Sequence, residues 1–322
     1  MRCRLVGSEM CIRDRSVCLS LVVTDMVDMG EKMNWLSYLK LRGNIGTSGK
    51  DAPLYALETT FVSNPGFNNY SGTGYTMQFP LIGPDGATVS GATLGNTIGS
   101  PDLKPEQTFQ WEVGADIALF KNRIQADYTY YQSKSTNLLV NVLLPHSSGY
   151  TSQTKNIGEI ENKGHELSVN VTPVQNVRNV KLDMYFTFTK NKNKVIKVSD
   201  DSDELAIGGS TVAGIAAKEG LPYGAWQVQD YERDPEGNIV VGADGYPIVA
   251  SERVYTGQTY QADYQMGFGS TLSWKGLSAS VQFGLSKGGY FYSGTKNLSD
   301  FNGTSLTSLV NDRQPYLVPG SV

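Results

Sequence analysis

Long hydrophobic runs are absent from this sequence of 322 residues. No stretch reaches 18 consecutive apolar residues, which excludes a helix that spans a bilayer. Basic charge is also scarce, because 27 Lys and Arg stand against 31 Asp and Glu and the net charge is −4. A nucleic-acid-binding domain would carry a basic patch. We therefore expect no nucleic acid among the partners, and a fold whose apolar residues are spread along the chain.

Groups suited to catalysis are few. The two histidines are His146 and His165, and we expect His165 to be a solvated residue at a polar-facing strand start. The carboxylates between Asp200 and Glu204 lack the full spacing of an EF-hand, so a solvated loop is favoured over a calcium site. No glycine-rich stretch leads from a strand into a helix. We expect no catalytic, cofactor-binding or metal residue, no cofactor and no enzyme, and we assign no substrate-binding residue.

Cysteine is confined to the first 18 residues, as Cys3, Cys11 and Cys18. Their spacing matches neither a common zinc site nor a redox pair. Charged residues interrupt the apolar core that a signal peptide would need. The run LVGSEMCIRDR resembles translated sequencing-adapter read-through. We expect residues 1–27 to be a non-native or unstructured leader, and the fold to reside in residues 28–322.

The stretch FQWEVGADIALFKNRIQADYTYY, residues 109–131, alternates apolar and polar residues and changes phase once. Successive side chains of a strand point to opposite faces, so each half has one apolar and one polar face. A turn at Lys121–Asn122 places Leu119 opposite Ile124 and Ile117 opposite Ala126. Apolar residues then meet on the same face, which predicts a hairpin.

The same pattern recurs elsewhere. Strands 260–274 and 277–285 are predicted to pair around Lys275–Gly276, with Trp274 opposite Leu277 and Phe268 opposite Phe283. Two further strands include residues 167–171 and 180–188, joined through residues 173–179, and an earlier strand covers residues 35–45. Seven long strands are therefore expected.

The connections alternate strictly between short and long. Short joints lie near residues 121–122, 173–179 and 275–276, whereas residues 46–108, 134–162 and 190–259 form long ones. Transmembrane barrels have this asymmetry, with short periplasmic turns and long extracellular loops. A tilted strand of about 11 residues stands about 27 Å tall, close to the apolar band of such a barrel. A soluble β-sandwich, the alternative, has strands of about 5–6 residues.

Four aromatic residues fall near the expected rims. Trp35 and Trp274 lie beside the short-turn rim, and Trp111 and Tyr130 lie toward the opposite rim. Aromatic belts mark both edges of a membrane protein. Ordinary packing is the alternative for each ring.

Five runs resemble the SusC/RagA class of TonB-dependent outer-membrane receptors, in family order and at family-like spacing. They are WLSYLKLRGNIGTSG (35–49), SPDLKPEQTFQWEVGAD (100–116), LPHSSGYTSQTKNIGEIENKGHELSVNVTP (144–173), EGLPYGAW (219–226) and PYLVPGSV (315–322).

The resemblance implies a many-stranded barrel in the outer membrane of a Gram-negative bacterium. It also implies nutrient uptake: glycans or peptides imported with a SusD-like surface lipoprotein and energy from the TonB complex. The plug, TonB box, signal peptide and closing strand of the family are not recognised. We therefore expect an all-β fold, a partial, truncated transmembrane antiparallel β-barrel within residues 28–322.

Two other function classes stay open. A surface-exposed, β-rich polysaccharide-binding adhesin would bind without transport and would need a closed soluble fold. A glycoside hydrolase would place two carboxylates about 5–9.5 Å apart. Glu112 and Asp116 lie on the polar face but are isolated in an otherwise ordinary pattern.

Overall fold

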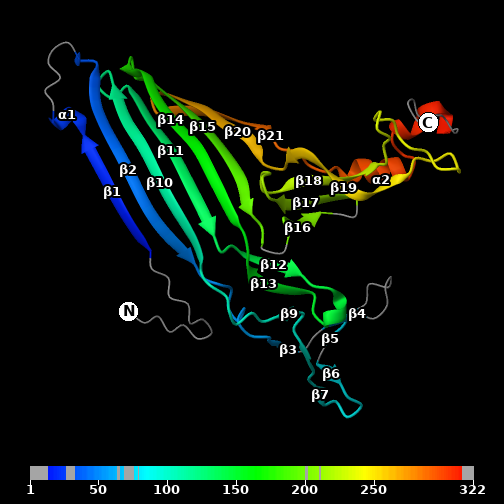
Figure 1. Cartoon of the computed structure of the whole chain (residues 1–322). Coiled ribbons are helices and arrows are strands. Elements are labelled where there is room, and N and C mark those ends of the chain that lie inside the picture. Colours follow the sequence, from blue (N-terminus) through cyan, green and yellow to red (C-terminus); the bar gives the residue numbers. More distant parts are fainter. Residues whose placement is uncertain are drawn as a thin grey trace. The chain divides into compact units, whose positions relative to one another are not determined.

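The computed structural model describes residues 14–26, 33–63, 66–68, 76–78, 80–199, 202–209 and 212–313 (Figure 1). Its largest element is an eight-stranded sheet in the order β1-β2-β10-β11-β14-β15-β20-β21. The strands are β1 (Arg15–Val22), β2 (Leu36–Lys50), β10 (Glu106–Leu119), β11 (Ile124–Thr136), β14 (Glu159–Val177), β15 (Val180–Lys197), β20 (Ala262–Trp274) and β21 (Leu277–Gly288). Neighbours in this sheet follow one another in chain order, and all seven expected strands belong to it. The all-β prediction is confirmed.

The predicted pairing of β20 with β21 is confirmed residue by residue. Trp274 lies opposite Leu277, and Phe268 lies opposite Phe283. The turn Lys275–Gly276 between them has positive φ at both residues, 46° and 88°. A turn of this kind matches the twist of the two strands that it joins.

The hairpin of β10 and β11 is also confirmed. Lys121 and Asn122 adopt positive φ, and the backbone N–H of Arg123 donates to the carbonyl of Phe120. Farther along, the hydroxyls of Thr108 and Ser135 lie 2.8 Å apart. This contact fits the register in which Leu119 opposes Ile124.

The third joint is shorter than expected. Strand β14 continues to Val177, and only Arg178 and Asn179, with φ of 53° and 64°, form the turn to β15. Pro173 therefore lies inside a strand, and the expected joint 173–179 is wrong. Proline removes one backbone donor from a strand but does not prevent the chain from continuing in extended conformation.

Part of the expected leader is a strand. Residues 15–22 form β1, which lies beside β2, and the backbone N–H of Gly49 donates to Asp14 Oδ1 at 2.7 Å. These residues are thus not unstructured, because the edge of β2 offers backbone groups with which an extended segment can pair. The non-native origin of the segment stays a prediction, and residues 1–13 lie outside the described part of the chain.

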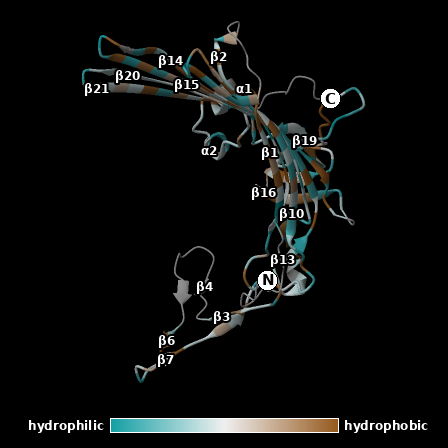
Figure 2. Ribbon diagram, turned by 90° about the vertical axis from the view of Figure 1, so that its left-hand side faces the viewer, coloured by the Kyte–Doolittle hydropathy of each residue, from teal (hydrophilic) through white to brown (hydrophobic). Residues whose placement is uncertain are grey.

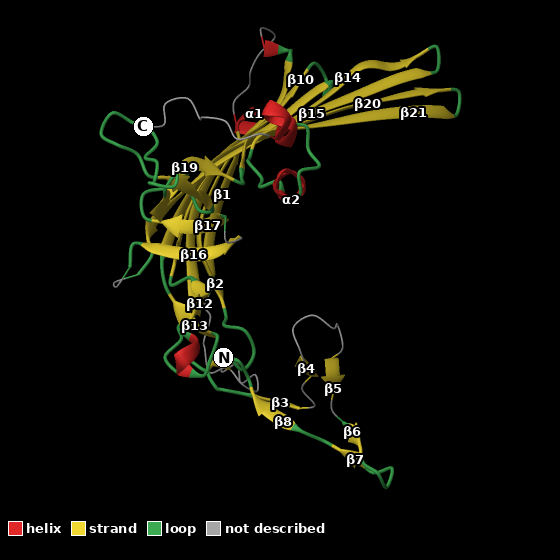
Figure 3. Cartoon of the chain, turned by 90° about the vertical axis from the view of Figure 1, so that its right-hand side faces the viewer, coloured by secondary structure: helices red, strands yellow, loops and turns green. Residues whose placement is uncertain are grey.

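The long connections contain small sheets of their own (Figure 3). One has the order β12-β13-β9, another β16-β17-β18-β19, and three pairs are β3–β8, β4–β5 and β6–β7. Their bounds are β3 (Phe61–Ser63), β4 (Gly66–Asn68), β5 (Thr76–Gln78), β6 (Leu81–Ile82), β7 (Thr88–Val89), β8 (Ala92–Leu94), β9 (Thr97–Ile98), β12 (Leu139–Leu143), β13 (Ser152–Asn156), β16 (Glu204–Gly209), β17 (Ala213–Lys218), β18 (Ala225–Tyr231) and β19 (Val249–Thr259). We call β16-β17-β18-β19 the loop sheet. The long connections are thus partly ordered by their own strand pairing.

Helices are short in the described residues. They are α1 (Val23–Met26), α2 (Gly294–Phe301) and two 3-10 segments, His146–Ser148 and Thr307–Arg313. Ser293 caps α2 by accepting a hydrogen bond from the backbone N–H of Lys296.

By contacts the chain divides into two compact units, each described by itself. The first contains Met1–Leu19, Asn44–Trp111 and Ser133–Ile160, and the second contains Ser20–Gly43, Glu112–Gln132 and Glu161–Val322. In the second unit, the buried apolar residues gather mainly at the loop sheet and the end of β15. They are Ala118, Val195, Val198, Ala213, Ala216, Ala217 and Ala225.

The large sheet has an exposed apolar face. Figure 2 shows hydrophobic and hydrophilic residues alternating along β14, β20 and β21. Leu272, Phe283 and Leu285 on the apolar side are 48%, 62% and 54% exposed. Contiguous exposed apolar side chains of this kind mark a surface that contacts another protein or a membrane.

The two ends of the sheet order, β1 and β21, each have one strand neighbour. Unpaired backbone groups are not tolerated in hydrocarbon. We therefore expect the 322-residue chain, refolded alone into lipid or detergent, to oligomerise or aggregate. Size-exclusion chromatography with light scattering and migration on unheated gels would measure this. A monomeric, heat-modifiable, protease-resistant band would contradict it.

Candidate functional site

The polar face of the large sheet carries an ion-pair network across three strands. Arg42 on β2 donates to Asp116 Oδ1 of β10 at 2.5 Å, and to Asp127 Oδ2 and Thr129 Oγ1 of β11 at 2.7 and 2.5 Å. Lys40 Nζ lies 3.1 Å from Asp116 Oδ2. The four charged side chains are 24–46% exposed, so water screens the network and its net contribution to stability is small. The network holds the long side chains of Lys40 and Arg42 against the polar face of the sheet.

Glycines on the same face make room for large side chains of the next strand. Gly269 lies directly opposite Tyr185, and a Cβ there would be 2.2 Å from Tyr185 Cε1. A Cβ on Gly164 would be 2.4 Å from Tyr131 Cζ. Only glycine allows these rings to lie across the neighbouring strand. Sequence reasoning missed both tyrosines, because the signal is a glycine opposite a tyrosine and requires the register.

The apolar face ends in aromatic residues at the short-turn rim. Trp274 is the last residue of β20, directly before the turn, and is 48% exposed. Lys275 Nζ lies 5.3 Å from the centre of its ring. Trp35, just before β2, is similarly exposed. Both tryptophans thus lie at the rim where the sequence predicts them.

His165 is exposed, as expected, but it does not lie on the polar face. Its Nδ1 lies 2.8 Å from Tyr128 Oη, and its ring centre is 5.0 Å from that of Tyr130. Both tyrosines belong to the apolar face of β11, so His165 shares that face. Strand alternation explains this, because His165 has the same parity as Leu167, an apolar-face residue. The three rings form an aromatic group on the loop side of the face, in which Tyr128 and His165 are exposed.

The loop sheet is fastened to the end of β15 by the segment EGLPYGAW. The backbone of Val195 accepts from Gly220 N–H and donates to Leu221 O, both at 2.9 Å. The Asn193 side chain accepts from Tyr223 N–H at 2.9 Å and donates to Gln261 Oε1 at 2.6 Å. Ala216 of β17 is fully buried. This root of the 190–259 connection is therefore packed structure.

A polar cluster lies within the loop sheet. Gln227 donates a short hydrogen bond to Glu204, and Lys218 Nζ lies 3.9 Å from Glu204 and 4.8 Å from the centre of the Tyr255 ring. Burial, with the nearby negative charge of Glu204, raises the pKa of Tyr255. Its hydroxyl therefore stays protonated at physiological pH.

The expected carboxylate cluster is only partly described. Asp200 and Asp201 lie outside the described residues, while Glu204 is in β16. Within the described part of the chain, no three His, Cys, Asp or Glu side chains gather in a way that could hold a metal ion.

The tip of the same connection consists of two tight turns. Asp234 accepts from the backbone and side chain of Asn238 at 2.8 and 3.0 Å, which lowers the pKa of Asp234. Gly242 N–H donates to the carbonyl of Tyr246 at 2.8 Å, and Tyr246 is 72% exposed. The tip thus presents polar turns and an exposed aromatic ring.

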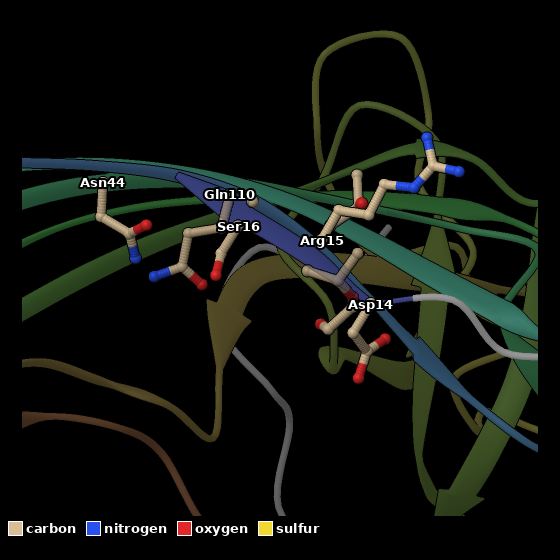
Figure 4. Close-up of a pocket in the computed structure, with 9 residues that line it drawn as sticks. Asp14, Arg15, Ser16, Asn44 and Gln110 are labelled. Carbon is tan, nitrogen blue, oxygen red and sulfur yellow. The ribbon is translucent and has the colours of Figure 1, made fainter. Parts of the chain in front are cut away.

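A hollow of about 340 Å³ lies on the polar side of the first unit (Figure 4). Asn44, Gln110 and Ser16 point to one side of the ribbon, whereas Arg15 points to the other. Asn44 and Gln110 are polar-face residues of β2 and β10, as alternation predicts. Most of the residues that line it have polar side chains: Asp14, Arg15, Ser16, Asn44, Gly46, Thr47, Ser48, Thr108 and Gln110.

A second hollow in this unit, of about 480 Å³, is lined in part by the segment SPDLK, residues 100–104. The Asn156 side chain accepts from Lys104 N–H and donates to the carbonyls of Lys104 and Asn137, at 2.6, 2.7 and 2.9 Å. This amide ties the approach to β10 to strand β13. The hydrogen bonds indicate a structural role for the segment.

No helix among the described residues has the length and hydrophobicity needed to cross a membrane.

The known proteins that this chain resembles in sequence include several TonB-dependent receptors. TonB-dependent receptor P3 of Formosa agariphila is 30% identical over 251 residues, which are 70% of this chain and 24% of the relative. TonB-dependent receptor SusC of Bacteroides thetaiotaomicron is 26% identical over 283 residues, 81% of this chain and 26% of the relative. The chain therefore spans about a quarter of the length of these curated relatives.

Among solved structures, the RagAB peptide importer in its closed-closed state matches with a TM-score of 0.63 and 24% identity, over 86% of this chain and 29% of that one. This likeness supports the fold. The sequence match to SusC confirms the resemblance to the SusC/RagA class. Residues 33–217, more than half of the chain, match the family described as "TonB dependent receptor-like, beta-barrel". The chain belongs to the family of TonB-dependent receptor β-barrels.

Proposed function

We propose that the chain is a wall segment of an outer-membrane transporter that imports glycans or oligopeptides. A SusD-like surface lipoprotein and the TonB complex are its partners in this proposal. The observation that carries it is the two-faced sheet, because a barrel wall must present apolar residues to lipid and polar residues to a hydrated lumen. The named relatives SusC and the RagAB peptide importer support the assignment to this transporter class.

The two faces have distinct roles in this proposal. The apolar face, bounded by Trp274 at one rim and by Tyr128, Tyr130 and His165 toward the other, contacts the bilayer. The polar face, with the network around Arg42, lines the hydrated path. The loop sheet and its tip stand on the extracellular side, where ligand and partner arrive.

The adhesin alternative requires the apolar face to be buried in protein. The exposure of Leu272, Phe283 and Leu285 favours a membrane-facing wall instead. A glycoside hydrolase is disfavoured because Asp116 is held by Lys40 and Arg42, as part of a network spread along the wall.

The wall prediction compares two adjacent positions of the central strand β14. Val169→Arg on the apolar face should lower the free energy of unfolding of the complete barrel by about 2–4 kcal/mol, because it places a cation in hydrocarbon. Asn170→Arg on the polar face should be nearly neutral. Guanidinium unfolding in lipid vesicles measures both. Equal costs at the two positions would remove the membrane-facing assignment.

The loop prediction separates the tip from its root. Glu232 N–H donates to Ile248 O at 2.8 Å, so residues 234–246 can be replaced by two glycines without separating their ends. Uptake of the cognate glycan or peptide, or capture of the lipoprotein, should fall while barrel stability stays almost unchanged. Growth on the nutrient, measured beside surface expression, is the readout.

The matched control for the tip is Ala216→Leu in the buried root. Overpacking there should destabilise the loop sheet by about 1–3 kcal/mol. Normal uptake without the tip would exclude the tip from the mechanism. A barrel that no longer assembles without it would show that the tip is structural.

A further inference from the structure

Strand β15 carries three lysines directly after its apolar residues. Phe186 and Phe188 are followed at the same two-residue spacing by Lys190, Lys192 and Lys194, all exposed. In a strand, residues two apart lie on the same face. The apolar face of β15 therefore continues into a row of cations.

Contacts of the intervening residues confirm the face. Asn191 accepts a hydrogen bond from Tyr131 and donates to Asn162, and Asn193 bonds to Gln261 and Tyr223. These contacts lie on the polar side of the sheet, so the lysines that alternate with Asn191 and Asn193 point to the opposite side. Phe188 lies on that opposite side too, with its ring centre 5.9 Å from that of Tyr264.

Strand β21 repeats the pattern at the same level. Its apolar-face residues end at Leu285, and Lys287 follows two positions later. Lys287 Nζ lies 5.8 Å from the centre of the Tyr264 ring, beside Phe188. A cation thus follows the last apolar residue on this strand as well. We call Lys190, Lys192, Lys194 and Lys287 the lysine row.

The lysine row lacks an anionic partner among the described residues. None of its members forms an ion pair with another described residue, whereas nearby Lys163 is paired with Glu161 at 2.9 Å. Neighbouring lysines on β15 have Cα atoms about 6.6 Å apart, which places like charges close together. Such a row favours a partner that carries several negative charges.

The height of the row places it at the edge of the bilayer. Val180, at the short-turn end of β15, lies opposite Trp274, and Lys190 is ten residues farther along. Ten residues span about 33 Å along the strand, or about 25 Å along the membrane normal at a tilt of about 40°. The apolar band of an outer-membrane barrel is about 25 Å tall. Lys190 therefore lies where hydrocarbon ends and headgroups begin.

We propose that the lysine row binds the phosphate groups of an anionic lipid in the extracellular leaflet. Its continuity with the lipid-facing side selects a membrane lipid over a soluble protein, because a ligand on the row is also beside Phe188 and Leu285. The apolar residues would contact the acyl chains and the lysines the phosphates. The inference rests on the proposed membrane placement of the wall.

The test uses the complete receptor in an uncharged detergent, with lipid A, a bisphosphorylated glycolipid, and its dephosphorylated form as probes. The variant Lys190→Gln/Lys192→Gln/Lys194→Gln should bind lipid A at least about tenfold more weakly, because each lysine near an anionic headgroup adds to the attraction. The dephosphorylated lipid should bind weakly to both proteins. Native mass spectrometry or thermophoresis gives the affinities.

Two variants serve as controls. Replacing the exposed lysines Lys50, Lys155 and Lys296 by Gln removes the same charge elsewhere, and should change affinity less than about twofold. Changing the three β15 lysines to Arg keeps the charge and should retain binding. Heat-modifiable migration of each protein verifies the barrel independently of lipid binding. A failure of the proposed barrel wall can therefore be distinguished from a failure of the proposed lipid site.

Three results would overturn the lipid site. They are equal loss of lipid A binding in the two Gln variants, equal affinity for phosphorylated and dephosphorylated lipid, and full displacement of lipid A by inorganic phosphate, which would indicate a free-phosphate site. Loss of binding in the Arg variant would likewise contradict a charge-based mechanism.

Discussion

The large sheet depends on one constraint: its apolar face must leave water, although the described chain provides no second layer to cover it. Leu272, Phe283 and Leu285 remain about half exposed or more, on β20, which pairs with a strand on each side, and on β21, which pairs with β20. Hydrocarbon can cover such a face, because a paired strand presents it no unsatisfied backbone group. In the proposed membrane placement, Trp35 and Trp274 lie at one edge of the hydrocarbon and the lysine row lies at the other.

Burial in the second unit is concentrated in the loop sheet. Val195 and Ala216 are almost completely inaccessible, whereas the apolar residues of β21 are all exposed. In the proposed membrane placement, the large sheet turns its apolar face to lipid, whereas the loop sheet buries its apolar side chains in protein. This explains why a long connection can combine a rigid root with exposed turns at its tip.

The polar face is shaped by small residues as much as by charges. Gly269 and Gly164 allow tyrosines to lie flat across neighbouring strands, and Gly114 leaves room for Arg42, whose Nε would be 2.6 Å from an added Cβ. Side chains held against the wall leave the space beside it open to water. The arrangement suits a surface along which a hydrated solute moves.

Strand alternation and turn chemistry determined most of the large sheet from sequence. The pairing of Trp274 with Leu277 follows from a period of two and a short turn, both local properties. The same period places His165 beside Tyr128 on the apolar face. Because its side chain is polar, His165 was expected on the polar face instead. Pro173 was expected to lie in a joint, but strand β14 continues through it. Residues 15–22 were set apart because of their composition, yet they form strand β1.

Only the tertiary structure decided which distant segments meet. The junction of Asn193 with Tyr223 and Gln261, the clamp of Asn156 on Lys104 and the network around Arg42 join residues far apart in the chain. Their partners depend on register and loop closure, which no local pattern encodes. The sequence therefore determined which face of each strand is apolar, and the fold decided what each face touches.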